Sequence, residues 1–166
     1  MHIAALQRQD HKSVMHLYKA VTSHLRENGI YQWDRFYPNR FVIHNDLKNG
    51  CLFGVKQDGV VIAAVAVDEK QSSKYLQVNW QDRQGKAACI HRLAVHPDYQ
   101  GMGLGKKLLQ FAEQYTLTQG CSSIRLDVYS ANETALAMYT RAGYMHTGAV
   151  QFPFRSTPYY CFEKIL

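Results

Sequence analysis

The spacing of apolar residues along the chain changes between the period of helices and that of strands. Helical spacing comes first, in four apolar residues at intervals of three or four: Val14, Leu17, Val21 and Leu25. They predict an amphipathic helix over residues 11–28, with Asp10 as its cap and Gly29 at its end. A short apolar run at 3–6 precedes this helix, and a second helix is predicted at 39–48.

Strand-like runs follow the second helix. Two apolar segments, 51–57 and 60–67, flank Asp58-Gly59, and this arrangement predicts a β-hairpin with a type I′ turn. Gly54 interrupts the first of these segments, so it marks a candidate β-bulge.

The second half of the chain alternates strands and helices. Its predicted elements are a strand at 75–80 within a polar connection, a strand at 90–95, a helix at 104–119, a strand at 123–129, a helix at 131–142 capped by Ser130, and strands at 144–150 and 159–165. The order of all these elements indicates an α+β or α/β layer with a mixed sheet. The strand–helix–strand unit at 90–129 should be a right-handed parallel crossover.

Composition narrows the class of protein. The 166 residues, 46% of them apolar, suit one globular domain. The net charge of +6 favours acidic partners, yet the basic residues are scattered, which makes nucleic-acid binding a weak second interpretation. The four cysteines lie in apolar runs without metal-ligand spacing, so we expect buried thiols, no metal and a cytoplasmic protein. We expect neither a signal peptide nor a membrane span.

The most informative stretch is a glycine-rich loop between a strand and a helix. Pro97 closes the strand, and Gly101, Gly103 and Gly105 lead into the helix. Glycines let main-chain amides approach an anion, and the first turn of a helix has unpaired N–H groups and partial positive charge. The junction therefore predicts a phosphate site, although the same glycines are also compatible with a loop that only needs positive φ.

Two common phosphate loops fit this sequence poorly. A P-loop requires Ser or Thr after Gly-Lys, whereas Gly105-Lys106 is followed by Lys107. A dinucleotide fold requires Gly-x-Gly-x-x-Gly near the first strand and an acidic residue about 20 residues later. Asp127 lies at a comparable distance, but the glycine spacing differs and the loop comes late in the chain.

The motif Gln100-x-x-Gly103-x-Gly105, after the strand ending Leu93-Ala94-Val95-His96-Pro97, resembles the acetyl-CoA pyrophosphate loop of the GNAT superfamily of N-acetyltransferases. The run from Asn132 to Tyr144 resembles the second motif of that family, and the similarity covers residues 60–166 best. The resemblance implies one GNAT-like α+β domain over residues 1–166, with a mixed, mostly antiparallel sheet of six to seven strands, a central splayed parallel pair and about four helices. It implies an acceptor-binding helix–loop–helix at about 10–50 and a cofactor-binding core at about 87–145.

The same resemblance implies how acetyl-CoA is held. Main-chain groups of Leu93 and Val95, with Ala94 between them, would pair with the pantetheine arm, and the Val95 N–H would polarise the thioester carbonyl. The strand is expected to bulge there. The pyrophosphate would be bound by main-chain groups of Gln100, Gly101, Met102, Gly103, Leu104, Gly105 and Lys106. Asn132 is expected to contact the cofactor.

Catalysis would require an acid for the departing thiolate and a base for the amine. The resemblance gives Tyr139 the role of acid, seven residues after Asn132 on one predicted helix face. His91 is the first candidate base, because its strand resembles that of arylalkylamine N-acetyltransferases and histidine titrates near neutrality. Asp127 is the second, with a salt bridge to Arg92 or Arg125 as the alternative interpretation. We expect direct attack of the amine in a ternary complex.

The acceptor is left open by the sequence. Two aromatic loops, at 30–38 and 151–158, suit a small amine or a peptide amine, and their rings equally suit packing over the core. The candidate acceptor residues are Trp33, Tyr37, Trp80, Phe152 and Phe154. For Trp80, the alternative to acceptor binding is a role in local packing. A module that binds acyl-CoA without turnover is the competing function, and both a monomer and a homodimer are compatible with the sequence.

Overall fold

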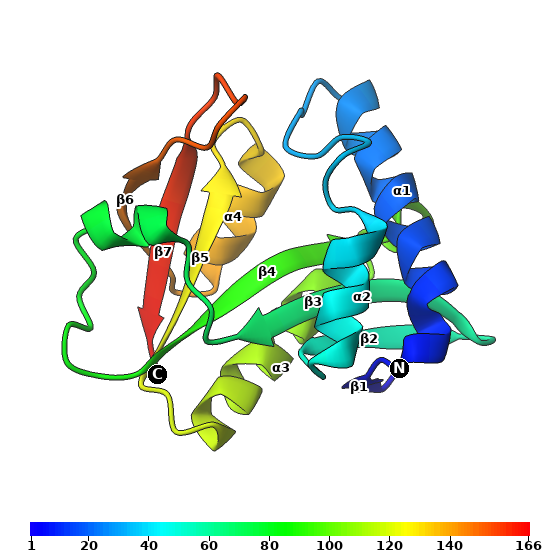
Figure 1. Ribbon diagram of the computed structural model, residues 1–166, viewed down its shortest axis with the longest axis horizontal. Helices are drawn as coiled ribbons and strands as arrows, with labels where there is room; N and C mark the ends of the chain where they lie inside the picture. Colours follow the sequence, from blue (N-terminus) through cyan, green and yellow to red (C-terminus); the bar gives the residue numbers. More distant parts are fainter. The chain divides into compact units, whose positions relative to one another are not determined.

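A computed structural model describes residues 1–166 and contains seven strands and four α-helices. In chain order they are β1 Ile3–Ala5, α1 His11–Glu27, α2 Arg40–Lys48, β2 Leu52–Gln57, β3 Val60–Asp68, β4 Ala87–Val95, α3 Leu104–Thr118, β5 Ser123–Tyr129, α4 Glu133–Arg141, β6 Met145–Val150 and β7 Tyr159–Ile165. The strand order in the sheet is β1-β2-β3-β4-β5-β7-β6, in which β4 and β5 are the parallel pair (Figure 1). The predicted fold class is therefore confirmed, as is the order of elements outside the connection between β3 and β4.

The chain forms two compact units. The first contains Met1–Val67 and His91–Ala112, and the second contains Asp68–Ile90 and Glu113–Leu166. Strand β4 begins in the second unit and ends in the first, and α3 begins in the first and ends in the second.

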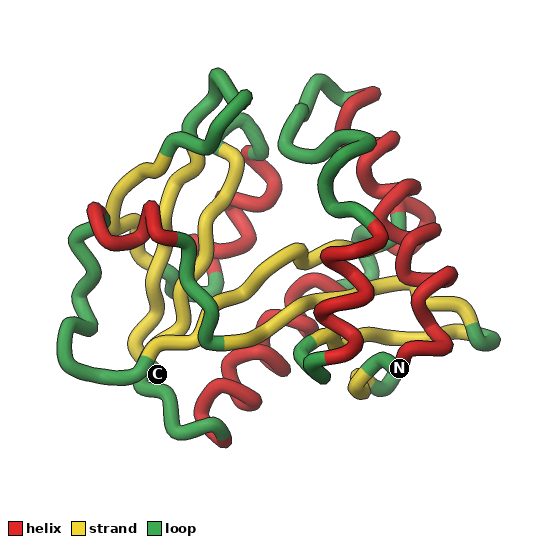
Figure 2. Tube along the Cα trace, viewed as in Figure 1, coloured by secondary structure: helices red, strands yellow, loops and turns green.

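In the first unit, α1 and α2 pack on one face of β2 and β3 (Figures 1 and 2). The buried residues of this core are Leu6, Val14, Leu17, Tyr18, Val21, Trp33, Ile43, Leu47, Leu52, Val61, Ala64, Ala66 and Ala94. Three residues of the predicted α1 stripe are buried, and the fourth, Leu25, is partly buried against the same cluster. Phe53, adjacent to Leu52 in β2, meets Phe111 of α3 at 4.9 Å between ring centroids, as strand alternation requires.

The second unit is built on β5, β7 and β6, which pair antiparallel, with the start of β4 parallel to β5. The β4–β5 ladder joins Ala87–Cys89 to Ser123–Arg125. Its core includes Tyr75, Trp80, Cys89, Val150 and Cys161. None of the four cysteines forms a disulfide, and all four are buried, as expected. No helix in the chain has both the length and the apolar character that a membrane crossing requires.

The predicted strand at 75–80 is wrong, because Ser73–Gln77 forms a short 3-10 helix, η2. The apolar residues there do not share one face of a ladder. Tyr75 and Trp80 turn inward and meet at 4.9 Å between ring centroids, while Leu76 is exposed.

Three local predictions also need correction. Asp10 does not cap α1 with its side chain, because its carboxylate instead accepts the Gln7 N–H at 2.8 Å and pairs with Lys56. Helix α4 is capped by Asn132 rather than Ser130, and it starts at Glu133. The β-bulge of β2 lies between Val55 and Lys56.

At Gly54, the predicted bulge position, the constraint is close packing. A Cβ built there would lie 2.5 Å from the Ala63 carbonyl oxygen, so no side chain fits. The hairpin that follows is confirmed, since Asp58 and Gly59 both have positive φ, as a type I′ turn requires.

Candidate functional site

The first candidate region is the loop that leads into α3. Residues Pro97–Tyr99 form a short 3-10 turn, η3, and the loop then runs through Gly101 and Gly103, whose φ angles are +78° and +77°. A Cβ at either position would meet nothing within 4 Å. The two glycines are therefore required by backbone conformation, and the space next to them is open.

Main-chain amides at the start of α3 precede the helical hydrogen bonds. The bond that opens the helix runs from the Lys107 N–H to the Gly103 carbonyl, at 3.1 Å, so the N–H groups of Leu104, Gly105 and Lys106 come before it. The side chains of Leu104 and Leu108 are buried and fix the helix, whereas Lys106 and Lys107 are exposed. Fixed amides, partial positive charge and open space together fit a diphosphate group.

Strand β4 carries an irregularity at Arg92, which has a φ of +51°. A non-glycine residue in this left-handed region costs about 1–2 kcal/mol and persists only where its surroundings fix it. Here the Tyr18 hydroxyl donates to the Arg92 carbonyl at 2.7 Å. The guanidinium donates to both carboxylate oxygens of Asp46, at 2.7–2.9 Å, and to the Tyr37 hydroxyl at 2.9 Å.

This network joins distant parts of the first unit to the end of β4. Burial alone would lower the pKa of Arg92, but neighbouring Tyr37 and Asp46 raise it above its ordinary value. Burial also raises the pKa of Tyr18 well above the usual range, so its hydroxyl stays a donor. The Arg92–Asp46 pair therefore remains charged and anchors Tyr37, at the end of the aromatic loop 30–38, to the strand that was predicted to hold the cofactor.

The other predicted residues of β4 are partly buried. His91, Leu93 and Val95 are neither fully exposed nor in the core, whereas Ala94 belongs to the core of the first unit. After the strand, the His96 imidazole accepts the Asp98 N–H at 3.2 Å, and the Gln100 side-chain amide donates to the Val95 carbonyl at 3.3 Å. Met102, at the tip of the loop, is exposed.

In the second unit, Tyr139 lies on α4 with only 7% of its surface exposed. Burial raises its pKa above the usual range for tyrosine, and the charge of Asp127 adds to the increase. The phenol is therefore protonated throughout the neutral range. Its ring lies edge-on to Tyr144, with centroids 5.8 Å apart. Asn132, seven residues earlier, is buried at the N-cap, and its side-chain oxygen accepts the Ala135 N–H at 3.1 Å.

Asp127, on β5, accepts a hydrogen bond from a distant tyrosine. The Tyr75 hydroxyl donates to its Oδ2 atom at 2.6 Å. Arg125 is bound to Glu163, at 2.9 Å, and Arg92 to Asp46, so each arginine has a buried carboxylate partner of its own.

The candidate acceptor residues differ in exposure. Trp33 lies in the core with its ring edge-on to Tyr18, and Trp80 is buried with its indole N–H donating to the Tyr75 carbonyl at 2.9 Å. Both placements favour the packing alternative. Phe152 packs on Tyr159, with centroids 5.0 Å apart, whereas the side chain of Phe154 is fully exposed.

Two features of the site were missed from the sequence, namely the Arg92–Asp46 pair and the Tyr75–Asp127 hydrogen bond. Each joins residues 46 or more positions apart. No local pattern marks such partners, although an aspartate in the second predicted helix and a tyrosine in a polar connection were the available signals.

Known proteins share the sequence pattern and the fold of this chain. Residues 13–144 match the Acetyltransferase (GNAT) family. The chain is 29% identical to an uncharacterised N-acetyltransferase of Bacillus subtilis, YesJ, over 159 residues, which is 94% of this chain and 85% of YesJ. A GNAT acetyltransferase structure from Streptococcus agalactiae has a TM-score of 0.84 and 22% identity, covering 99% of this chain and 95% of its own.

A second solved structure, that of YncA from Salmonella typhimurium with its cofactor acetyl-CoA, has a TM-score of 0.75 and 17% identity, covering 100% of this chain and 94% of its own. These likenesses define an acetyltransferase fold. The family match spans most of the chain, so the protein belongs to the GNAT family of acetyltransferases, enzymes that use acetyl-CoA.

Proposed function

We propose that this enzyme transfers an acetyl group from acetyl-CoA to a primary amine. The observation that supports this most is the entry to α3, where Gly101 and Gly103 have positive φ and three main-chain amides precede the helical hydrogen bonds. When bound, acetyl-CoA supplies the acetyl group as a thioester, which the amine attacks directly in a ternary complex. The four buried cysteines, none in a disulfide, favour a cytoplasmic location.

The chain's own contribution to cofactor binding is proposed to come from two segments. Main-chain amides of residues 100–106 hold the diphosphate, because helix N-termini attract anions. Main-chain groups of Leu93 and Val95 bind the pantetheine arm, and the Val95 N–H polarises the thioester carbonyl. The left-handed conformation of Arg92, held by Tyr18 and Asp46, interrupts the regular strand just before these residues.

Tyr139 is proposed to be the acid that stabilises the departing thiolate. Its raised pKa keeps the phenol protonated at neutral pH. A thiol has an ordinary pKa of about 8.5, so complete proton transfer from such a phenol is uphill. Tyr139 therefore acts mainly by donating a hydrogen bond to the sulfur as charge develops on it.

Asp127 and His91 remain the two candidate bases. Asp127 gains support from two observations: its charge influences Tyr139, and its carboxylate accepts a hydrogen bond from Tyr75. An imidazolium group ordinarily loses its proton near pH 6.5 and a carboxylic acid near pH 4, so the pH dependence of turnover separates the two kinds of base.

A four-amine panel tests the proposed reaction. It contains 2-phenylethylamine, an alanine tripeptide with a free N-terminus, Nα-acetyl-lysine amide and glucosamine. Release of free thiol from acetyl-CoA is measured with each amine, alongside the shift in melting temperature with acetyl-CoA, CoA and ATP.

The proposal predicts amine-dependent thiol release and stabilisation by acetyl-CoA and CoA above that by ATP. Stabilisation without thiol release would indicate a module that binds acyl-CoA without turnover. Stabilisation by ATP alone would contradict the assignment of the α3 loop to coenzyme A.

A further inference from the structure

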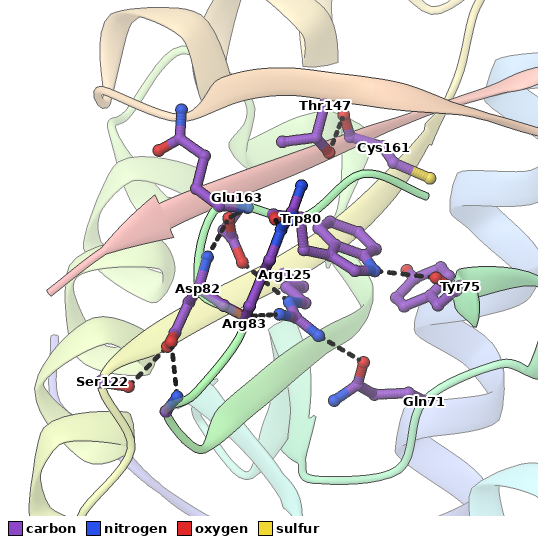
Figure 3. Close-up of polar contacts among 12 residues, drawn as sticks. Gln71, Tyr75, Trp80, Asp82, Arg83, Ser122, Arg125, Thr147, Cys161 and Glu163 are labelled. Atoms are coloured by element: carbon purple, nitrogen blue, oxygen red, sulfur yellow. Dashed lines mark hydrogen bonds and ion pairs between the residues drawn. The ribbon is translucent and has the colours of Figure 1, made fainter. Parts of the chain in front are cut away.

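The connection between β3 and β4 is held against the sheet of the second unit by a buried ion pair. Arg125 of β5 and Glu163 of β7 are only 8% and 2% exposed, and Nε of the arginine donates to the carboxylate at 2.9 Å. The other nitrogens of Arg125 donate to the Gln71 side chain at 2.9 Å and the Asp82 carbonyl at 2.6 Å (Figure 3). The second oxygen of Glu163 accepts the Gln81 and Asp82 N–H groups.

These contacts satisfy both charges with groups of residues 71–82. Arg125 also lies over the Trp80 ring, 4.5 Å from its centroid, and the Ser122 hydroxyl donates to Asp82 at 2.6 Å (Figure 3). A buried pair whose nitrogen and oxygen atoms are all hydrogen-bonded fixes the groups around it, because releasing any of them leaves a polar atom buried without its partner. The connection is therefore an ordered part of the unit, although its sequence is polar.

The ordered connection places the Tyr75 hydroxyl within hydrogen-bond distance of Asp127. Tyr75 is 4% exposed, its carbonyl accepts the Trp80 indole N–H at 2.9 Å, and its ring packs on Trp80. Its hydroxyl lies 2.6 Å from Oδ2 of Asp127, a distance typical of a strong bond to a charged acceptor. Since burial keeps the pKa of Tyr75 well above its ordinary value, the phenol is the donor and the carboxylate the acceptor.

Four groups of the second unit feel the charge of Asp127, each from a different element. They are Tyr75 on η2, Cys89 on β4, Tyr139 on α4 and Cys161 on β7. Burial raises the pKa of each, so all four are neutral at neutral pH. Among them, Tyr75 is the one whose hydroxyl fixes the carboxylate by a direct hydrogen bond.

We propose that Tyr75 is a positioning residue for acetyl transfer: its hydroxyl holds the Asp127 carboxylate charged and in one orientation, ready to take a proton from the ammonium group of the acceptor. The inference rests on the proposed function and deepens it. The N–H bond of the ammonium breaks, its electron pair stays on nitrogen for the attack, and the proton joins a carboxylate oxygen of Asp127. Release of that proton to water after turnover restores the carboxylate.

The test is the pH dependence of kcat/KM from pH 4 to 9, using the panel amine that is acetylated fastest. Tyr75→Phe removes the hydrogen bond that favours the charged carboxylate, so the acidic limb should move up by about one pH unit. Asp127→Asn should lower kcat/KM by about 10²-fold or more and remove this limb. Adding Tyr75→Phe to Asp127→Asn should then change nothing further, because the two residues act through one interaction.

Controls separate positioning from packing. Tyr160→Phe removes a phenol of β7 that packs on His146, and it should leave the acidic limb where it is. Trp80→Phe removes the donor to the Tyr75 carbonyl without changing the phenol, so it should move the limb in the same direction by less. This variant also keeps the inference testable if Tyr75→Phe does not fold.

The outcomes are distinguishable. The positioning role would be overturned if Tyr75→Phe lowered the melting temperature but left the acidic limb of the kcat/KM profile unmoved. If Tyr75→Phe does not fold, the same result in Trp80→Phe would overturn it. Either result would leave the proposed function intact. Additive losses in the double variant would overturn it as well. Absence of turnover by the parent enzyme with all four amines would overturn the proposed function, and this inference with it.

Discussion

Replacing Asp46 by asparagine leaves the buried Arg92 guanidinium without its negative partner while keeping the size of the side chain. The two side chains are only 10% and 6% exposed, and three N–O contacts of 2.7–2.9 Å join them. Breaking a buried pair by removing one charge costs about 3–5 kcal/mol, because the remaining charge is desolvated. At about 2–4 °C per kcal/mol for a chain of this size, the melting temperature should fall by roughly 6–20 °C.

The measurement is urea unfolding and calorimetry of Asp46→Asn beside a surface control. Lys86 and Glu69 also form a short pair, at 2.7 Å, but each side chain is 50% exposed. Glu69→Gln should therefore unfold at the same urea concentration as the parent within error. If Asp46→Asn also matched the parent, the structural role of the Arg92–Asp46 pair would be refuted. In a cycle with Arg92→Gln, the double variant should lose less than the sum of the single losses.

Three further predictions concern single side chains. Tyr139→Phe should lower kcat by at least about tenfold with an unchanged Kd for acetyl-CoA, measured by thiol release and calorimetric titration. Phe154→Ala should raise KM for the amine without lowering the melting temperature if its loop binds the acceptor, whereas Trp33→Phe should lower that temperature because the ring is in the core. The Ser122 hydroxyl is the main cause that lowers the pKa of Asp82 from 3.8 to about 2. The charged Asp82 carboxylate therefore stabilises the fold above about pH 4, and this contribution is lost as the pH falls through about 2. The difference in unfolding free energy between the parent and Asp82→Asn should shrink over this range.

The parts of the fold that could be predicted from the sequence are those set by neighbouring residues. The Asp58-Gly59 turn and the glycines before α3 need particular φ values, and those needs are visible in the residue types. The amphipathic stripe of α1 is likewise local, because one helix face collects its apolar residues.

The predictions that proved wrong concern local structure that depends on contacts between residues far apart in the sequence. The stretch around Tyr75 alternates like a strand, yet the Arg125–Glu163 pair and the Trp80 ring hold it as a 3-10 turn. Ser130 and Asn132 are both good caps, and the backbone of the folded chain decides in favour of Asn132.

The functional partners of Arg92 and Asp127 depend on the same long-range packing. A charged residue in the sequence does not reveal which opposite charge will be buried with it, so the pairing of Arg92 with Asp46 and of Arg125 with Glu163 could not be predicted.

The central claim is that main-chain amides at the start of α3 bind the diphosphate of acetyl-CoA, and two glycines at opposite ends of that helix test it. Gly103 and Gly120 have φ angles of +77° and +73°, and a Cβ at either would meet nothing within 4 Å. Alanine should therefore strain both positions to a similar extent and lower both melting temperatures similarly.

Calorimetric titration with acetyl-CoA is the direct measurement. Gly103→Ala should raise the Kd by at least about tenfold, since it disturbs amides that donate to a charged group, while Gly120→Ala should bind like the parent. Equal Kd values for the parent and both variants would contradict the account.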